Sequence, residues 1–198
     1  PVGLFSNIFG SKKKEEKADT SPYLASEKDP KELHFARVFT EKGGKFIFSE
    51  NIEQTRNYFH QILAENGWGI ADLKSDSKSL DSFFNTTVNP EVSKNKKTTA
   101  QLLGCEYLIA NKGSVLVCSH QIQNLKLDEL PENLIILASA AQFVEDVSEA
   151  MTMINTRYKD SLPSNITTLN TFNSNKEDDF LSYGSSTKNL YLIVQEDS

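Results

Sequence analysis

The chain has few of the residues that mark redox, secreted or membrane proteins. It contains two cysteines, Cys105 and Cys118, among 198 residues, which excludes a disulfide framework and an iron–sulfur ligand set of its own. No apolar run approaches the roughly 20 residues that span a bilayer. The first residues also lack the basic and then apolar pattern of a signal peptide. We therefore expect a cytoplasmic protein without a transmembrane segment.

Basic residues and glycine motifs are scarce as well. Lysine and arginine number 21 against 27 acidic residues, so the net charge is −6 and the pI about 5.2, which argues against a nucleic-acid partner. The sequence has no Gly-x-Ser-x-Gly elbow, Walker loop or dinucleotide glycine fingerprint. Hydrophobic residues make up 38% of the chain, and the mean hydropathy is −0.43. These values fit one soluble domain with a sizeable core.

Residues 1–28 differ in composition from the rest. An apolar group is followed by a basic run: Val2, Leu4, Phe5, Ile8 and Phe9, then Lys12, Lys13 and Lys14. One interpretation is a short amphipathic helix that docks on a membrane surface or a partner. The favoured one is a flexible tail, because one and a half apolar turns bind weakly. The domain proper, residues 29–198, then starts at Asp29-Pro30, an N-cap followed by proline at the first helical position.

Apolar periodicity and turn residues predict alternating helices and strands over residues 29–198. The expected helices run from Asp29-Pro30 to Gly43-Gly44, over 50–66, around 80–84 and over 140–158. The expected strands are 45–49, 68–73, 107–110, 115–118, 133–138, 166–172 and 188–194, and 88–97 is expected to be a loop over the sheet edge. Such alternation with short connections predicts an α/β fold with a mostly parallel central sheet and flanking helices.

The stretch from Leu103 to Gln123 organises this prediction. Two apolar runs, 107–110 and 115–118, flank the polar link Asn111-Lys112-Gly113-Ser114, which predicts a strand, a tight turn and a second strand. Gly113 is the residue best able to take a positive φ in that turn. Because few polar side chains interrupt either run, we expect both strands to be covered on two faces and to form the centre of the fold.

The same stretch, residues 106–117, resembles the signature of the LUD (lactate utilisation) domain family, in which an acidic-aromatic pair leads into Ile-Ala-Glu-Thr-Gly-Thr and a second strand. The resemblance extends in order through 39–46, 130–137, 140–158 and 188–194, so it covers roughly residues 30–197. It implies the fold shared by sugar-phosphate isomerases, CoA transferases and 5-formyltetrahydrofolate cyclo-ligases. It also implies an accessory role beside iron–sulfur partner proteins that oxidise L-lactate to pyruvate.

The family's functional motifs are degenerate in this chain. Asn111 stands in the place of the family's Glu, Lys112 and Ser114 in the places of its two Thr, and only Gly113 is kept. A neutral amide can hydrogen-bond a ligand but cannot act as a nucleophile or general base. The resemblance therefore leaves no catalytic residue to expect, and residues Asn111, Lys112, Gly113 and Ser114 become candidates for ligand binding.

Two further family motifs fall near the C-terminus. In 169–179 the family's Gly-Pro and Arg are missing, and Glu177-Asp178-Asp179 is better explained as a solvated helix start than as a metal site. Near Gly184, Ser185 and Ser186 the family has a His-Gly-Pro turn. These three residues could form a backbone nest for a small anionic ligand, although a plain turn is the simpler interpretation.

The remaining candidates carry little chemistry. His34 and His60 lie in expected helices and are interpreted as surface or packing residues. A zinc site from Cys105, Cys118 and His120 lacks the paired Cys-x-x-Cys spacing and a fourth ligand, so we expect no metal site and two ordinary buried thiols.

Three functional hypotheses follow from the sequence. The first is the accessory subunit that the resemblance implies, with no cofactor bound by this chain and iron–sulfur clusters on its partners. The second is a small-molecule enzyme of the cyclo-ligase or transferase type, with a pocket at the strand ends. The third is a diverged domain that keeps only partner binding. Loss of the Glu and of both later motifs favours the first and third over the second.

Overall fold

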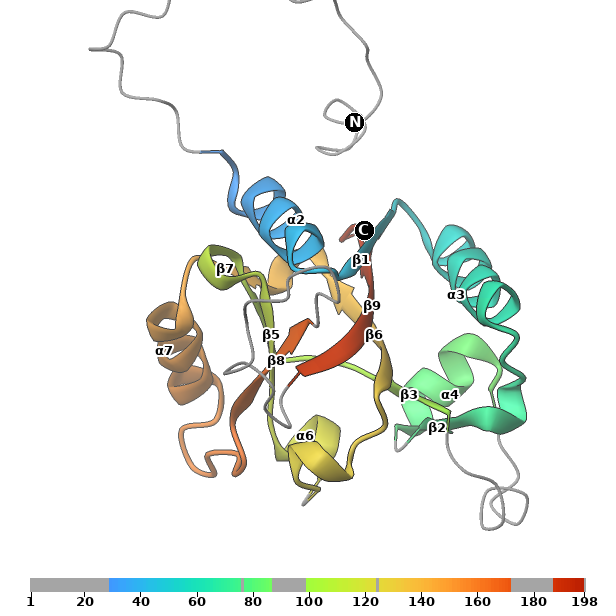
Figure 1. Ribbon diagram of the computed structural model, residues 1–198. Coiled ribbons are helices and arrows are strands. Elements are labelled where there is room, and N and C mark those ends of the chain that lie inside the picture. The colour runs from blue at the N-terminus through green and yellow to red at the C-terminus, as the bar shows by residue number, and fades with distance from the viewer. Residues whose placement is uncertain (1–28, 76, 87–98, 124, 172–186, 198) are drawn as a thin grey trace, which may run out of the picture.

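Two connected sheets make up the protein in the computed structural model, which describes residues 29–75, 77–86, 99–123, 125–171 and 187–197. The expected tail, the expected loop at 88–97 and Gly184–Ser186 lie outside these residues. The main sheet has five parallel strands in the order β2-β3-β6-β9-β1 (Figure 1). Their bounds are β1 Lys45–Ser49, β2 Leu73–Ser75, β3 Ala100–Leu103, β6 Asn133–Ser139 and β9 Thr187–Gln195.

The second sheet has the order β8-β5-β4-β7. Its strands are β4 Tyr107–Ile109, β5 Ser114–Val117, β7 Phe143–Val144 and β8 Thr167–Thr171. The pairs β4–β5 and β5–β8 are antiparallel, whereas β4–β7 is parallel. Strand β8 pairs in parallel with the first two residues of β9, Thr187 and Lys188, and so joins the two sheets. The fold is thus α/β with a mostly parallel sheet, as the sequence predicted.

Side chains cap some of the helices. The helices are α2 Lys31–Glu41, α3 Ile52–Asn66, α4 Lys78–Phe84, α6 Ser119–Ile122 and α7 Val147–Arg157. Helix α2 has no such cap: it begins at Lys31 after Pro30, whereas the sequence predicted Asp29 as the N-cap and Pro30 as the first helical residue, and the Asp29 carboxylate instead pairs with Arg37. The side chain of Asn51 accepts a hydrogen bond from the Gln54 N–H at the start of α3, and Gly67 ends that helix in the left-handed region at φ +66°. The first three helices confirm the expected helices up to residue 84.

Strand β9 separates two hydrophobic clusters because its side chains alternate between its faces. On one face Leu190, Leu192 and Val194 pack in a cluster with the phenylalanines of α2 and one face of the hairpin β4–β5. On the other face Tyr191 and Ile193 pack with α3. The hairpin's outer face is covered by α7, so both hairpin strands are buried on two faces, as expected. Figure 1 shows α3 and α7 on opposite sides of the molecule.

Several details differ from the sequence prediction, which also did not include the short helix α6. The expected strand at 68–73 is a 3-10 turn, Ile70–Asp72, followed by β2. Strand β3 was not predicted. The helix expected at 140–158 begins at Val147, because a 3-10 turn and β7 precede it and the Asp146 side chain caps it. The hairpin lies in the second sheet rather than at the centre, where β6 and β9 lie.

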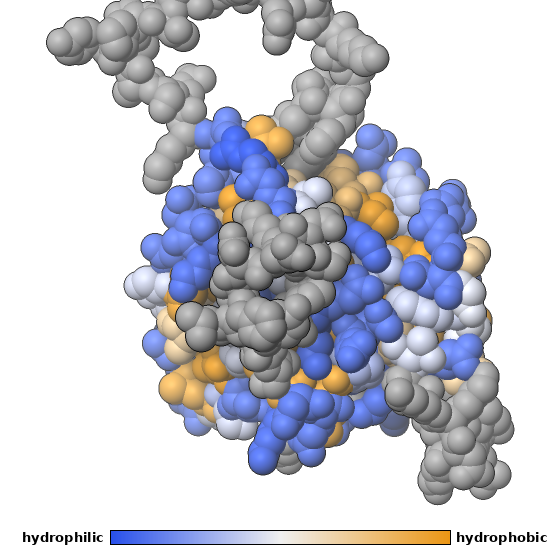
Figure 2. All heavy atoms as spheres, viewed as in Figure 1, coloured by the Kyte–Doolittle hydropathy of each residue, from blue (hydrophilic) through white to orange (hydrophobic). Residues whose placement is uncertain are grey.

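No helix among the described residues is long and apolar enough to cross a membrane. On the face shown in Figure 2, hydrophilic residues predominate over α2 and α3, and hydrophobic ones gather in smaller patches.

The turn between the hairpin strands lies directly under α2. Gly113 has φ +52°, and a Cβ there would lie 2.6 Å from the backbone N of Phe39 and 2.9 Å from the carbonyl carbon of Val38. Both are backbone atoms of a helix, which cannot move without disturbing the core. Gly67 has a similar φ, +66°, with no atom within 4 Å of such a Cβ. The two glycines therefore share a left-handed conformation and differ in close packing.

We expect Gly113→Ala to lower the free energy of unfolding by about 3 kcal/mol or more, because it adds a backbone clash to the left-handed strain. Gly67→Ala should cost about 1–2 kcal/mol, from the left-handed strain alone. Urea unfolding of the two variants and the wild type measures both values. Equal losses would contradict the close approach of the turn to α2.

Candidate functional site

A buried carboxylate, Glu106, lies at the start of the hairpin with 2% of its surface exposed. Its Oε1 accepts hydrogen bonds from Gln121 Nε2 at 2.9 Å and from Cys118 Sγ at 3.3 Å. The hydroxyl of Tyr158 lies 3.2 Å from both carboxylate oxygens. The guanidinium of Arg157 lies 3.3 Å from Oε2. We call these five residues, together with His120, the Glu106 cluster.

Hairpin register and a short helix bring the Glu106 cluster together. Because Tyr107 pairs with Leu116, the residue before β4 and the residues after β5 lie at the same end of the hairpin. The Cys118 N–H donates to Gln121 Oε1 at 2.9 Å. This hydrogen bond folds the side chain of Gln121 back over the N-terminus of α6. Arg157 and Tyr158 come from the end of α7, which packs on the hairpin's outer face.

His120 adds an imidazole nitrogen to the carboxylate oxygens and the sulfur of the Glu106 cluster. Its Nδ1 lies 3.6 Å from Glu106 Oε1, and its ring lies against that of Tyr158 at 4.9 Å between centroids. The side chain of His120 is 47% exposed, so solvent reaches this side of the cluster. A carboxylate oxygen, a sulfur and an imidazole nitrogen, from Glu106, Cys118 and His120, all lie within 4.8 Å of one another.

Hydrogen bonds keep the buried carboxylate ionised. Burial by itself would raise the pKa of Glu106, but hydrogen bonds from Gln121, Cys118 and Tyr158 and the charge of Arg157 lower that pKa below its ordinary value. Burial and the neighbouring carboxylate raise the pKa of Cys118 to about 11, against hydrogen bonds from backbone groups that lower it. The cluster therefore holds an anionic carboxylate beside a protonated thiol.

Sequence analysis considered Cys118 and His120 as zinc ligands only together with Cys105, and it expected no metal site. Cys105 and Cys118 are buried free thiols, as expected. The donor group contains Glu106 in place of Cys105, whose own carbonyl accepts a hydrogen bond from Gln142 Nε2 at 2.6 Å. The sequence could have indicated Glu106, because a hairpin places the residue before its first strand beside the residues after its second strand.

The predicted ligand-binding residues 111–114 divide between surface and core. Asn111 and Lys112 are exposed, and the Asn111 N–H donates to the Glu145 carbonyl at 3.0 Å. Gly113 and Ser114 are buried, and Ser114 Oγ has no hydrogen-bond partner among the described residues. Gly184, Ser185 and Ser186 lie outside the described residues, so ligand binding by these residues stays a prediction.

The two other histidines lie on helices, as expected. His34 on α2 lies 3.1 Å from the Arg37 guanidinium through its Nδ1. His60 on α3 is exposed and its ring contacts that of Phe59.

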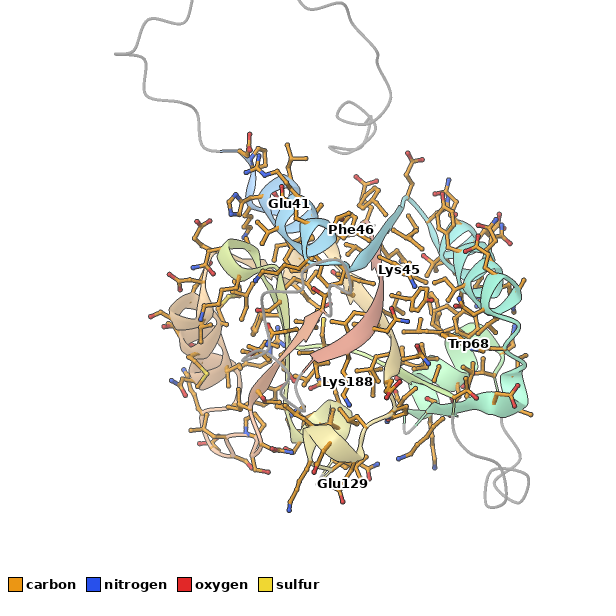
Figure 3. All side chains as sticks on the ribbon, viewed as in Figure 1. Glu41, Lys45, Phe46, Trp68, Glu129 and Lys188 are labelled. Carbon is orange, nitrogen blue, oxygen red and sulfur yellow. The ribbon has the colours of Figure 1, made fainter. Side chains whose placement is uncertain are left out.

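A second buried charge lies at the start of β9. Lys188 is 6% exposed, and its Nζ donates to the Leu130 carbonyl at 3.0 Å. Figure 3 shows it toward the turn that carries Glu129, Leu127–Glu129. Burial lowers the pKa of Lys188, and the charges of Glu132 and Asp128 offset part of this effect.

Comparison with known proteins identifies one family by its sequence model and a similar fold in a solved structure. The model of the LUD domain matches residues 33–194. A solved structure described as a DUF162 family protein from Deinococcus radiodurans is similar with a TM-score of 0.56 and 14% sequence identity, covering 83% of this chain and 96% of that one. At that identity the likeness shows the fold alone. No curated protein matches the chain.

Because Lys188 is buried, the free energy of unfolding should depend on pH in the alkaline range. Because the pKa of Lys188 is lower in the folded protein than in the unfolded chain, the folded state releases this proton first as the pH rises. We expect the free energy of unfolding of the wild type to rise relative to that of Lys188→Met as the pH increases toward about 10.4, the ordinary lysine pKa.

Denaturant titrations of wild type and variant across this pH range measure the difference. Lys126→Met, at an exposed lysine, controls for the loss of one charge. A difference between wild type and Lys188→Met that stays constant or falls with pH would contradict the burial of a charged Lys188.

Proposed function

We infer, because this chain belongs to the LUD domain family, that it acts as an accessory subunit in the oxidation of L-lactate to pyruvate. That reaction releases two electrons, which need an acceptor. The chain has two cysteines, and neither their number nor their positions supply the four ligands of an iron–sulfur cluster. The proposed electron path therefore runs through iron–sulfur clusters on partner proteins, as in the family members that this chain resembles.

The observation that carries the accessory role is the turn after β4. The family's carboxylate position holds Asn111, an exposed neutral amide that cannot take a proton at neutral pH. The next two residues of the turn are committed to α2: Lys42 Nζ donates to the Lys112 carbonyl at 2.7 Å, and Gly113 packs against the α2 backbone. This use of the turn supports a structural and partner-binding role over acid–base catalysis.

The proposal includes a cellular compartment and a class of ligand. Two free, buried thiols and no disulfide among the described residues are consistent with action in the reducing cytoplasm. A small anion, such as a carboxylate, remains the proposed ligand of Gly184, Ser185 and Ser186. The acidic net charge of −6 supports protein partners rather than nucleic acid.

Affinity purification of the tagged protein from its native cells, grown on lactate, tests the partnership. We expect mass spectrometry to identify co-purifying proteins that carry cysteine-rich iron–sulfur motifs. The same tag on an unrelated soluble protein is the control for adventitious binding. Recovery of the chain alone under these conditions would contradict the accessory role and direct attention to a ligand.

Replacement of the exposed amide separates accessory from catalytic roles. We expect Asn111→Ala to support growth on lactate within about twofold of the wild type in a strain that lacks the gene, because its side chain carries no acid–base chemistry. Lys112→Ala, at the neighbouring exposed position, is the matched control. A loss of growth in Asn111→Ala alone, with normal protein abundance, would establish a ligand-binding or catalytic role for this amide.

A further inference from the structure

We propose that Glu106, Cys118 and His120 bind a zinc ion, with water in the fourth coordination position. This site is independent of the accessory role proposed above. It differs from the zinc site that the sequence disfavoured, because a carboxylate replaces Cys105 as a ligand.

The distances of the sulfur and of the imidazole nitrogen from the carboxylate oxygen are close to those of tetrahedral zinc. Zinc–sulfur bonds of about 2.3 Å and zinc–oxygen bonds of about 2.0 Å place a sulfur and an oxygen about 3.5 Å apart, and a nitrogen and an oxygen about 3.3 Å apart. In the structure Cys118 Sγ lies 3.3 Å and His120 Nδ1 lies 3.6 Å from Glu106 Oε1. Shifts of about 0.2–0.3 Å would bring these two distances to the tetrahedral values. The sulfur of Cys118 and the ring nitrogen of His120 lie within 4.8 Å of each other, so the half-exposed histidine closes the remaining gap by turning toward the sulfur.

The residues around the donors already hold the carboxylate in place. Gln121 Nε2 and the Tyr158 hydroxyl both hydrogen-bond Glu106, and Gln121 is itself held by the Cys118 N–H. Such hydrogen bonds to ligands orient them and strengthen metal binding. The three ligands are fixed by hairpin register and by the first turn of α6, so little chain entropy is lost when the ion binds.

The donor types select zinc over other divalent cations. Magnesium and calcium prefer sites built from oxygen alone, whereas a thiolate, an imidazole and a carboxylate suit zinc. Binding replaces the Cys118 thiol proton, which leaves to solvent, with a zinc–sulfur bond. With three protein ligands, a fourth position remains for water on the side of the exposed His120.

Arg157 should compete with the ion for the negative charge of Glu106. Its guanidinium lies 3.3 Å from Glu106 Oε2 and its side chain is 50% exposed, so it can turn away into solvent. Zinc and Arg157 both need the same negative charge. Removal of the arginine should therefore strengthen zinc binding while it weakens the metal-free cluster.

The first experiment is isothermal titration calorimetry. The purified full chain is freed of metal by chelation and titrated with zinc chloride. We expect one equivalent to bind. Cobalt(II) should bind the same site and give the thiolate charge-transfer band and the intense visible bands of tetrahedral coordination. Absence of binding, or a cobalt spectrum without the thiolate band, would overturn the proposal.

Matched variants assign the ligands. We expect Cys118→Ser and His120→Gln each to weaken zinc binding at least tenfold, whereas Cys105→Ser and His60→Gln leave it within twofold. His120 is half-exposed, so its variant should fold even if a change at the buried Cys118 prevents folding. Equal effects of His120→Gln and His60→Gln would contradict the assignment.

Arg157→Met gives a result of the opposite sign. We expect tighter zinc binding in this variant, by about threefold or more, because a competing cation is gone. A merely structural role of the cluster would not produce this gain. Unchanged or weaker binding in Arg157→Met would show that the ion does not lie on Glu106.

Discussion

The register of strand β9 is the constraint on which the rest of the structure depends. Its side chains are buried on both faces, with Leu190, Leu192 and Val194 in one cluster and Tyr191 and Ile193 in the other. A slip of one residue would exchange the two sets and break both cores. Because β9 also pairs with β6, β1 and β8, this register places the main sheet and the second sheet relative to each other.

The Glu106 cluster follows from that placement. Strand β8 aligns β5, β5 aligns β4, and the hairpin is then closed between the main core and α7. This brings the acidic residue before β4 into a buried position, which costs free energy unless the charge is hydrogen-bonded. Gln121, Tyr158 and Arg157 satisfy it from two helices. The cluster therefore connects the ends of the hairpin, α6 and α7.

Sequence patterns predicted the elements well where local chemistry determines them. Asn51 and Gly67 bound a helix of the expected length, and apolar runs predicted β1, β6 and β9. Errors arose where tertiary pairing overrides local preference. Phe143 and Val144 fit an amphipathic helix, yet they pair with β4 as β7 because Asp146 caps the helix after them. The strand of residues 100–103 gave no clear signal beside a polar stretch.

The place of the hairpin among the strands and the members of the Glu106 cluster were harder to predict, because both depend on tertiary pairing. Buried strands of a central and of a peripheral sheet have the same apolar composition, so the hairpin was expected at the centre. The donor group combines residues 106, 118 and 120, whose proximity comes from the hairpin register and not from a motif spacing. The thiol and the imidazole were noticed in the sequence, but the carboxylate was interpreted only as part of a family signature.

The proposed accessory role connects this architecture with the LUD domain family. Under that proposal, a chain with the neutral Asn111 in this turn and only two cysteines would contribute to lactate oxidation beside partners that hold the iron–sulfur clusters. Lactate-dependent reduction of a dye acceptor tests this most directly, in extracts of native cells with and without the gene. The account predicts that deletion abolishes the activity, that added purified protein restores it, and that the purified protein alone has none. Full activity in the deletion extract, or turnover by the chain alone, would contradict it.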